Sequence, residues 1–424
     1  MKKNNGFTVK IISIGVIILL LMIGKLLISS KLEDRQYSSY EACSSISKAA
    51  GGPNVLNGIY LAVPFEYTIY TKDEDHNSVS PGDKGTLMIS PKKMNVDSDL
   101  ISEKRNLGIY SYPVFTGSVS LKADFDLVEL KIEKGIKYKT DEAYFLLKVS
   151  DVSMQSHPKF LINDGEYDTE LVGSGIKTNF KYAKGKFHFE TDLSVRGAGT
   201  FESVVNADET TMNVKCNWNS PGFTEYDYLP VRREITDEGF TATWNIPFGS
   251  VDSKYRIGFR LVESVDVYKK LDRAYNYGLL FIVVPFIALF LFELFANVQL
   301  HPVQYLLSGA ASVVFFLLLL ALSEHMNFDH AYFISGAASG TLVSLYIASI
   351  SRRKKIGFVM AGVFVALYSY LFCSLSSEDF ALLIGSLFAF IVIAVLMFFT
   401  RKDNLVKMDK KNLREEKKLE SSSC

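Results

Sequence analysis

The sequence predicts a membrane protein with an α-helical transmembrane unit of six spans and a large all-β extracytoplasmic domain, either a sandwich or a partly open barrel. Three observations lead to this prediction. The chain contains six apolar runs, one long polar block with alternating apolar positions, and Lys and Arg residues concentrated in particular links. Its 46 basic and 46 acidic residues, with 48% hydrophobic residues, exclude a disordered chain and a generally basic nucleic-acid-binding protein.

The six apolar runs are each long enough for an α-helix to cross roughly 30 Å of hydrocarbon at about 1.5 Å per residue. The first run covers residues 11–28 and contains one charged residue, Lys25. Because hydrocarbon offers no hydrogen-bond partner to an open backbone, we expect every run to be a helix. Five later runs form a five-span unit over residues 277–399, and they are Tyr277–Ala296, Gln304–Leu322, Ala331–Ile350, Gly357–Leu375 and Phe380–Phe399.

The basic residues of the short links orient the spans. Lys2, Lys3 and Lys10 precede the first run, residues 352–355 are all basic, and the tail 400–424 holds eight basic and five acidic residues. The links 323–330 and 376–379 contain no Lys or Arg. Because Lys and Arg favour cytoplasmic links, we expect the N-terminus (1–10) and the basic tail in the cytoplasm.

The first run is interpreted as an uncleaved signal anchor. The residues that follow it, Ser29-Ser30-Lys31, include small side chains but no A-x-A-like cleavage site. A cleaved signal peptide is the alternative.

Residues 31–274 form the predicted extracytoplasmic β domain. Apolar residues alternate with polar ones in four segments, as expected for half-buried strands of antiparallel sheets. The apolar positions are Val119, Leu121, Ala123, Phe125 and Leu127; Phe187, Phe189, Leu193 and Val195; Met212, Val214, Cys216 and Trp218; and Tyr255, Ile257, Phe259 and Leu261. Turn signals such as Pro81-Gly82-Asp83 and Pro221-Gly222 separate strands. A segment near Arg35–Lys48 is the one candidate helix of this block.

The usual catalytic and metal-binding motifs are absent from the sequence. It has no G-x-S-x-G, P-loop, dinucleotide fingerprint or H-E-x-x-H motif, so we expect no catalytic residue, metal or cofactor. The four cysteines, Cys43, Cys216, Cys373 and Cys424, lack metal-site spacing. Cys43 and Cys216 can pair in an oxidising compartment, but the alternating pattern around Cys216 favours a buried free thiol.

Two acidic patterns have structural interpretations that we prefer to chemical ones. Strand alternation puts Asp124 and Asp126 on the same solvent face, so they are interpreted as solvated charges instead of a catalytic pair. Asn163-Asp164-Gly165-Glu166 does not fit the spacing of an EF-hand loop and is interpreted as a hairpin turn.

Ionisable residues in or beside the spans are the candidate binding residues. A charge in lipid is costly, so Glu293, His301, Glu324 and His325 are consistent with a proton or substrate pathway, or with interfacial residues that snorkel or cap helix ends. A Ser-Gly-Ala-Ala-Ser motif occurs twice, at 308–312 and 335–339, and Gly336 and Gly340 form a G-x-x-x-G. We expect these small residues to be helix-packing faces, within one chain or between chains.

Four blocks of residues carry a resemblance to a known family. They are Glu293 with 301–307, 317–325 and 327–329; Asn217-Trp218, Pro221, Phe223, Leu229-Pro230, Arg233-Glu234, Gly239-Phe240 and Trp244; residues 121–126; and Gly52-Pro53, Leu56, Gly58 and Val63-Pro64. In these blocks the chain resembles the CreD family of cell envelope integrity proteins, found in the inner membrane of Gram-negative bacteria. The resemblance implies an inner-membrane location and a role in envelope integrity and envelope stress response. It implies no catalytic residue.

The favoured hypothesis is a non-enzymatic inner-membrane protein whose periplasmic domain binds envelope components. Its expected partners are the lipid bilayer and envelope proteins or glycans, and not nucleic acid, while the oligomeric state is left open. One alternative is a transporter or channel that uses Glu293 and Glu324/His325. Another is an enzyme that acts on wall or lipid substrates.

Overall fold

The computed structural model describes residues 4–72, 77–130, 135–150, 158–173, 175–247, 255–262, 267–296, 300–351, 354–376 and 381–399. The chain divides into two compact units. The helical unit combines Met1–Gln36 with Asp266–Cys424, and the β unit is Tyr37–Val265. Each unit is described separately below. The basic tail, the cluster Arg352-Arg353 and the link residues Glu378 and Asp379 lie outside the described residues.

The first helix, α1 (Asn4–Ala49), extends well beyond the predicted span at 11–28 and includes the candidate helix near Arg35–Lys48. Residues 29–49 contain neither Gly nor Pro, so nothing in the sequence interrupts the helix after the apolar run. The helix ends where Gly51 (φ 99°) and Gly52 (φ 74°) adopt left-handed conformations. The N–H groups of Gly51 and Gly52 donate to the carbonyls of Lys48 and Ser47, the pattern of a Schellman motif.

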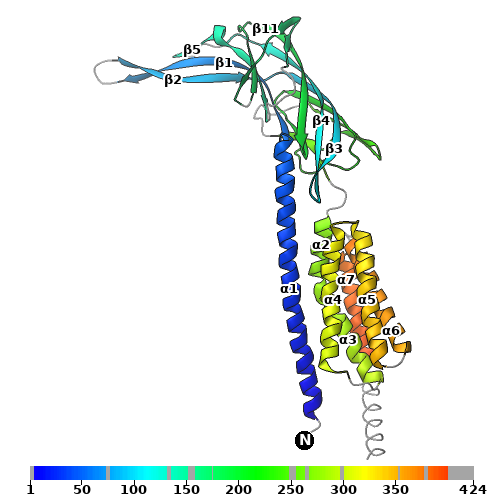
Figure 1. Ribbon diagram of the computed structural model, residues 1–424. Helices are drawn as coiled ribbons and strands as arrows, with labels where there is room; N and C mark the ends of the chain where they lie inside the picture. The colour runs from blue at the N-terminus through cyan, green and yellow to red at the C-terminus, as the bar shows by residue number, and fades with distance from the viewer. Residues whose placement is uncertain are drawn as a thin grey trace, which may run out of the picture. The chain divides into compact units, whose positions relative to one another are not determined.

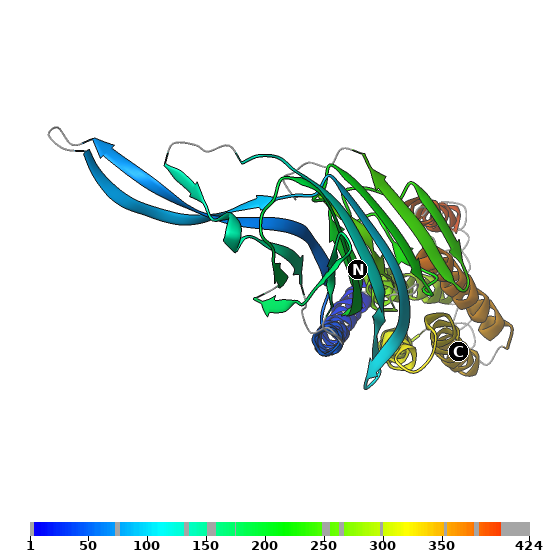
Figure 2. The ribbon, with the colours of Figure 1, turned by 90° about the horizontal axis from the view of Figure 1, so that it is seen from above.

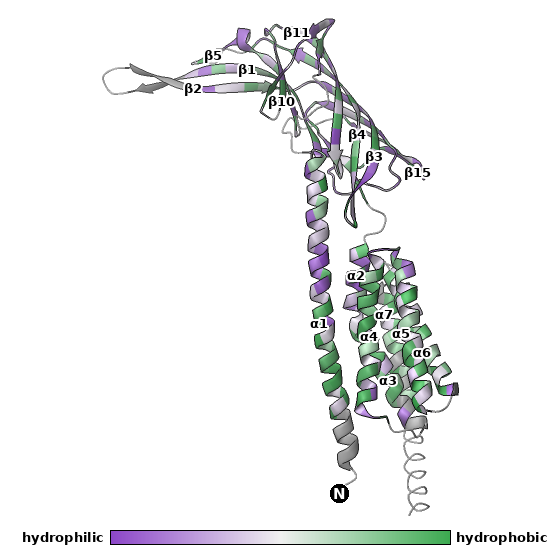
Figure 3. Ribbon diagram, in the orientation of Figure 1, coloured by the Kyte–Doolittle hydropathy of each residue, from purple (hydrophilic) through white to green (hydrophobic). Residues whose placement is uncertain are grey.

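The remaining helices belong to the helical unit, and Figure 1 labels them. They are α2 (Val267–Asn276), α3 (Gly278–Ala296), α4 (Pro302–Ser323), α5 (Phe328–Ser351), α6 (Lys354–Ser376) and α7 (Ala381–Phe399). In Figure 3 hydrophobic residues predominate along α3 to α6 and along the coloured part of the first half of α1, whereas α2 and the second half of α1 are largely hydrophilic.

Four helices among the described residues are long and apolar enough to cross a membrane, and these lie in α1, α4, α5 and α6. A fifth span results if α2 and the residues Gly278–Phe290 are counted together, although they are bent by 44°. The helix α7 coincides with the sixth apolar run and contains no charged residue. Six spans, and the side of the membrane that the β unit occupies, therefore stay predictions.

Aromatic side chains form the core of the helical unit. The ring of Phe281 on α3 stacks on that of Phe315 on α4, with centroids 4.9 Å apart. Phe315 also packs against Tyr332 on α5 and Tyr368 on α6. One cluster therefore joins four helices through rings that each bury a large apolar area.

The β unit contains two sheets among its described residues. Sheet A consists of β1 (Asn54–Lys72), β2 (Asn77–Ile89), β5 (Ile136–Tyr138), β6 (Tyr144–Val149), β9 (Glu170–Val172), β10 (Gly175–Asn179), β12 (Thr200–Val204), β14 (Pro221–Gly222) and β17 (Arg256–Leu261). Sheet B consists of β3 (Lys93–Leu107), β4 (Tyr110–Leu127), β7 (Phe160–Ile162), β8 (Gly165–Tyr167), β11 (Gly185–Ala198), β13 (Glu209–Cys216), β15 (Arg232–Thr236) and β16 (Gly239–Ile246). A short 3₁₀ helix covers Thr140–Glu142.

The strand order is β14-β17-β12-β1-β6-β10-β9 in sheet A, where β2 and β5 also pair with β1, and β15-β16-β13-β3-β4-β11-β7-β8 in sheet B. The prediction of antiparallel sheets is only partly correct, because β1 pairs with β12 and β3 pairs with β13 in parallel. Parallel partners need a long crossover connection, and more than 100 residues separate the strands of each of these pairs.

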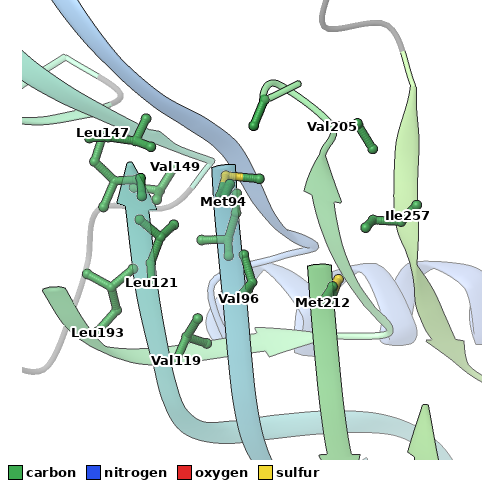
Figure 4. Close-up of a cluster of buried hydrophobic side chains, with 14 of the residues drawn as sticks. Met94, Val96, Val119, Leu121, Leu147, Val149, Leu193, Val205, Met212 and Ile257 are labelled. Atoms are coloured by element: carbon green, nitrogen blue, oxygen red, sulfur yellow. The ribbon is translucent and has the colours of Figure 1, made fainter. Parts of the chain in front are cut away.

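The two sheets enclose one hydrophobic core, as in the predicted sandwich. Figure 4 shows Val96, Leu121 and Met212 of sheet B near Leu147 and Ile257 of sheet A. The apolar positions predicted on β4, from Val119 to Leu127, are all buried. Tyr255 differs from the prediction, since it lies just before β17 and is 41% exposed.

A two-stranded ribbon of β1 and β2 extends beyond the rest of sheet A (Figure 1). The base of β1 contains a register shift between Leu56 and Ile59, opposite β6. Gly58 lies at this shift with φ 95°, and a Cβ atom there would be 2.4 Å from the amide carbon of Asn206. The same Asn206 donates through Nδ2 to the Ile59 carbonyl at 2.8 Å. The close approach therefore requires a glycine.

Candidate functional site

Glu293, the predicted residue deepest in a span, has a partner within the helical unit. It lies near the end of α3, and its Oε2 accepts a hydrogen bond of 2.8 Å from the hydroxyl of Tyr305 on α4. Tyr305 is completely buried, whereas Glu293 is partly buried. This hydrogen bond joins α3 to α4. Burial removes water as a hydrogen-bond partner for both groups, and the bond between them replaces it.

His301 caps α4. Its Nδ1 accepts a hydrogen bond of 3.4 Å from the N–H of Val303, and its own N–H donates to Oε1 of Gln304 at 3.0 Å. This reciprocal arrangement is a capping box, with Pro302 at the first helical position. The imidazole thus satisfies a backbone donor at the start of the helix.

Glu324 and His325 follow the opposite end of α4. Oε1 of Glu324 lies 3.2 Å from Nε of Arg35 on α1, and the side chain of Glu324 is 11% exposed. His325 is exposed. Nearby, Lys270 of α2 lies 3.6 Å from Asp329 of α5. These ion pairs connect four helices at one end of the unit.

The four predicted residues therefore belong to two separate places. Glu293, on the last turn of α3, bonds to the first turn of α4, which His301 caps, whereas Glu324 and His325 lie beyond the last residue of α4. A helix of 22 residues is about 33 Å long at about 1.5 Å per residue. The structure does not bring these groups together into one site.

The small residues of α4 and α5 lie at helix contacts. The hydroxyl of Ser339 in the second Ser-Gly-Ala-Ala-Ser motif donates to the Ala311 carbonyl in the first, at 3.0 Å. On the α6 side of α5, a Cβ atom on Gly340 would lie 3.3 Å from Cβ of Phe364. One on Gly336 would lie 3.5 Å from the ring of Tyr368. Both glycines thus face α6 of the same chain.

The acidic and cysteine residues considered in the β unit have ordinary surroundings. Asp124 lies 2.7 Å from Nδ1 of His188, and Asn163 begins the turn between β7 and β8 with φ 47°. No disulfide joins Cys43 to Cys216, and Cys216 is buried. Within the described ranges, no group of three or more His, Cys, Asp and Glu side chains is arranged to hold a metal ion.

The outer face of sheet B, the face turned away from the core, forms a second candidate site. Strand pairing aligns polar residues into two rows that cross five strands of sheet B. Figure 2 shows strands of this sheet lying side by side. The first row is Thr243, Asn213, Asp97, Ser120 and Asp192, and the second is Thr241, Lys215, Asp99, Ser118 and Ser194. Alternation along each strand turns these side chains outward and their neighbours into the core.

Two adjoining hollows lie over these rows, with volumes of about 710 Å³ and 490 Å³. They share Asp99, Lys215 and Thr241, and we call them together the polar groove. Their other polar side chains come from strands β3, β4, β11, β13, β15 and β16 and from adjoining turns, and include Asp97, Ser118, Ser120, Asp192, Asn213, Asn217, Thr243, Glu234, Thr236 and Glu238.

Hydrogen bonds fix part of the groove. Nδ2 of Asn213 donates to Oδ1 of Asp97 at 2.8 Å. Oδ1 of Asn217 accepts from the N–H of Ser102 at 2.6 Å and from its hydroxyl at 2.8 Å. The side-chain amides of Asn213 and Asn217 are therefore held by hydrogen bonds to β3. The hydroxyls of Ser118, Ser120 and Thr241 lie at the surface.

Sequence reasoning did not find the polar groove. Its signal was present in the polar positions between the predicted apolar ones, such as Asn213 and Lys215 on β13. In the sequence these positions are typical of an ordinary solvated face. The parallel pairing that puts β13 beside β3 could not be predicted.

Comparisons with known proteins agree on one family. Residues 6–405 match the family model described as inner membrane protein CreD. Inner membrane protein CreD of Escherichia coli (strain K12) is 27% identical over 408 residues, which cover 91% of this chain and 90% of that protein.

The solved structures that match include two of a mutant M1 zinc metallopeptidase from Deinococcus radiodurans. The first has 8% identity and a TM-score of 0.22, and the match covers 37% of this chain and 38% of that one. The second, with a Tyr-Ser-Ala substrate bound, has 7% identity and a TM-score of 0.25, and covers 70% and 90%.

Proposed function

The chain belongs to the CreD family of inner membrane proteins, and from this premise we propose that it supports the integrity of the cell envelope by binding an envelope component in the polar groove. It acts as a binding protein and not as an enzyme. In this proposal the β unit lies in the periplasm, and six spans, with both termini in the cytoplasm, hold it at the membrane.

The observation that carries the proposal is the polar groove itself. A hollow of about 710 Å³ is within the size range of ligand-binding pockets, roughly 300–1,000 Å³. Its wall is sheet B, which packs through its other face on the core of the β unit, so the lining side chains stand on a rigid support. Binding sites built on strands are held more precisely than sites on loops.

The proposed orientation rests on charge. Lys and Arg residues gather in the N-terminus, in the link 352–355 and in the tail 400–424, and they are missing from the links 323–330 and 376–379. Orientation of this kind puts the β unit on the side opposite the basic segments.

A transporter is the weaker proposal. Glu293 is hydrogen-bonded to Tyr305 and Glu324 is paired with Arg35, and α4 extends about 28 Å from Tyr305 to Glu324 at about 1.5 Å per residue. These contacts suit helix packing better than a continuous path. An ion flux in proteoliposomes that Glu293→Gln abolishes would favour transport instead.

The test blocks the groove without changing its charge. Ser118 is exposed and lies in the floor of the groove, so an indole there fills it. In cells that lack their own copy of the gene, the Ser118→Trp variant is expected to lose protection against detergent and chelator. Survival and leakage of a periplasmic enzyme measure the loss.

Leu171→Trp provides the matched control. Leu171 is 52% exposed on β9 of sheet A, outside the groove, and this change also adds one exposed indole. We expect this variant to protect like the unchanged protein. Full protection by Ser118→Trp at an equal protein level would refute a role for the groove.

A further inference from the structure

We propose that the ligand of the polar groove is an extended, cationic segment of a polypeptide, lying across the strands of sheet B. This inference rests on the proposed function, because it specifies the ligand of the same groove. Three properties of the groove lead to it: its charge, its length and its hydrogen-bonding side chains.

The groove is strongly acidic in an otherwise balanced chain. Five carboxylates line it, those of Asp97, Asp99, Asp192, Glu234 and Glu238, against the single ammonium group of Lys215. Among the residues that the structure describes, none of these six side chains forms an ion pair, whereas many other surface carboxylates of the β unit do, such as Glu190 with Lys122 at 2.8 Å. The groove therefore attracts cations and repels anions.

The carboxylates are spread out instead of clustered on one point. Asp97 and Asp99 are two residues apart on β3, about 7 Å along the strand. Asp97 and Asp192 lie in the same row with β4 between their strands, about 10 Å apart at about 4.8 Å per strand. Within the described ranges these carboxylates do not form a group of three or more that could hold a metal ion. Lys or Arg side chains repeated along a chain can each contact one of them.

The length of the groove fits a short peptide. The first row crosses five strands, so its four gaps of about 4.8 Å span about 19 Å. An extended chain covers this distance in about six residues at about 3.3 Å per residue. In such a chain, alternate side chains lie on one face about 7 Å apart. Two long cationic side chains on that face can therefore reach Asp97 and Asp192, which lie in the same row across the strands.

The other side chains of the groove can bind a peptide backbone. Ser118, Ser120, Thr241 and Thr243 carry hydroxyls that both donate and accept. The backbone groups of β13, β3 and β4 are already paired on both sides within sheet B. The peptide therefore cannot join the sheet as a further strand, and recognition comes from side chains.

The experiment measures binding of defined probes to the full-length protein in nanodiscs. The probe is a fluorescent hexapeptide of alternating Lys and Ser, and fluorescence anisotropy reports its binding. We expect the Asp97→Asn, Asp99→Asn, Asp192→Asn triple variant to bind it about 10-fold more weakly or worse, since each exposed charge pair contributes modestly. Lys215→Gln is expected to tighten binding, and added salt to weaken it.

A triple variant elsewhere controls for net charge. Asp164→Asn, Asp168→Asn, Glu170→Gln removes the same number of charges from exposed positions around β8 and β9, outside the groove. Binding should stay within about 2-fold of the unchanged protein. An equal loss in both triple variants would reveal nonspecific attraction and overturn the proposal.

Two further probes separate the ligand classes. A Glu-Ser hexapeptide and a neutral chitin oligosaccharide should bind at least about 10-fold more weakly than the Lys-Ser peptide, because neither carries a cation. Equal or tighter binding of either one would replace the cationic peptide with an anionic or a glycan ligand. If no probe binds while Ser118→Trp still abolishes protection in cells, this inference fails and the proposed function survives.

Discussion

At the scale of single residues, Cys216 illustrates how strand alternation determines chemical behaviour. Its side chain is 2% exposed in the core between the two sheets. Burial in this apolar surrounding raises the pKa of the Cys216 thiol, because it disfavours the thiolate. The thiolate is the reactive form, so the fold should protect this cysteine from alkylation.

We therefore expect Cys216 to be alkylated slowly by iodoacetamide in the folded protein. In a variant with Ser at the other three cysteines, labelling followed by mass spectrometry should stay incomplete at pH 8 and increase only weakly towards pH 9. The sign follows from the raised pKa, since a higher pH is needed to populate the thiolate. Denaturant should make labelling fast and complete.

The matched variant retains Cys43 alone. Cys43 is partly exposed at the end of α1, and its Sγ lies 3.7 Å from the Ser111 carbonyl. It should be labelled faster than Cys216 in the folded state. Rapid labelling of folded Cys216, or a disulfide between Cys43 and Cys216 in the mature protein, would contradict the structure.

At the scale of elements, the strands could be predicted where the pattern is local. On β4 and β13, the residues from Val119 to Leu127 and from Met212 to Cys216 alternate within one strand, and two-residue periodicity needs no knowledge of the partner. The parallel pair of β3 with β13 joins residues more than 100 positions apart. Nothing in either segment specifies that pairing, so the polar groove that depends on it was not predictable.

For the candidate residues of the spans, too, local features could be predicted and long-range partners could not. The sequence marks Glu293, His301 and Glu324 as polar groups that need an explanation in apolar surroundings. It does not reveal their partners, because Tyr305 and Arg35 become neighbours only when α3, α1 and α4 pack. The capping of α4 by His301 is the exception, since its partners Val303 and Gln304 are local.

The contact between α5 and α6 yields a prediction at the scale of elements. A Cβ atom on Gly340 would already lie 3.3 Å from Cβ of Phe364, so a longer side chain must push the helices apart. We expect Gly340→Leu to destabilise the protein by about 1–3 kcal/mol, the usual cost of overpacking. Thermal unfolding in detergent, with intrinsic fluorescence, measures the change.

Gly362 on α6 provides the control, because a Cβ atom there would meet nothing within 4 Å. Gly362→Leu should leave the unfolding temperature close to that of the unchanged protein. Equal stability of both variants would mean that α5 and α6 do not pack through Gly340 in the membrane.

At the scale of the whole molecule, the balance of 46 basic and 46 acidic residues conceals an ordered distribution. Basic residues dominate the segments before α1, between α5 and α6 and after α7, while the links after α4 and α6 carry only acidic charge. Because Lys and Arg in short links resist transfer across the membrane, this distribution predicts which side each link occupies. A neutral composition is therefore compatible with a strongly oriented protein.

The proposed arrangement predicts the location of every link. Alkaline phosphatase, which is active only in the periplasm, should be active when fused after Val262, Asn327 or Ser376. Green fluorescent protein, which fluoresces only in the cytoplasm, should fluoresce when fused after Leu300, Ser351 or Cys424. The fusions after Val262 and Leu300 also test whether the bent pair α2–α3 crosses as one span.

The fusions after Ser376 and Cys424 test whether α7 crosses the membrane. Because α7 has no charged residue and the tail that follows it is basic, we expect these two sites on opposite sides of the membrane. Phosphatase activity of a fusion after Cys424, with activity after Ser376 as well, would reduce the protein to five spans and put its basic tail in the periplasm.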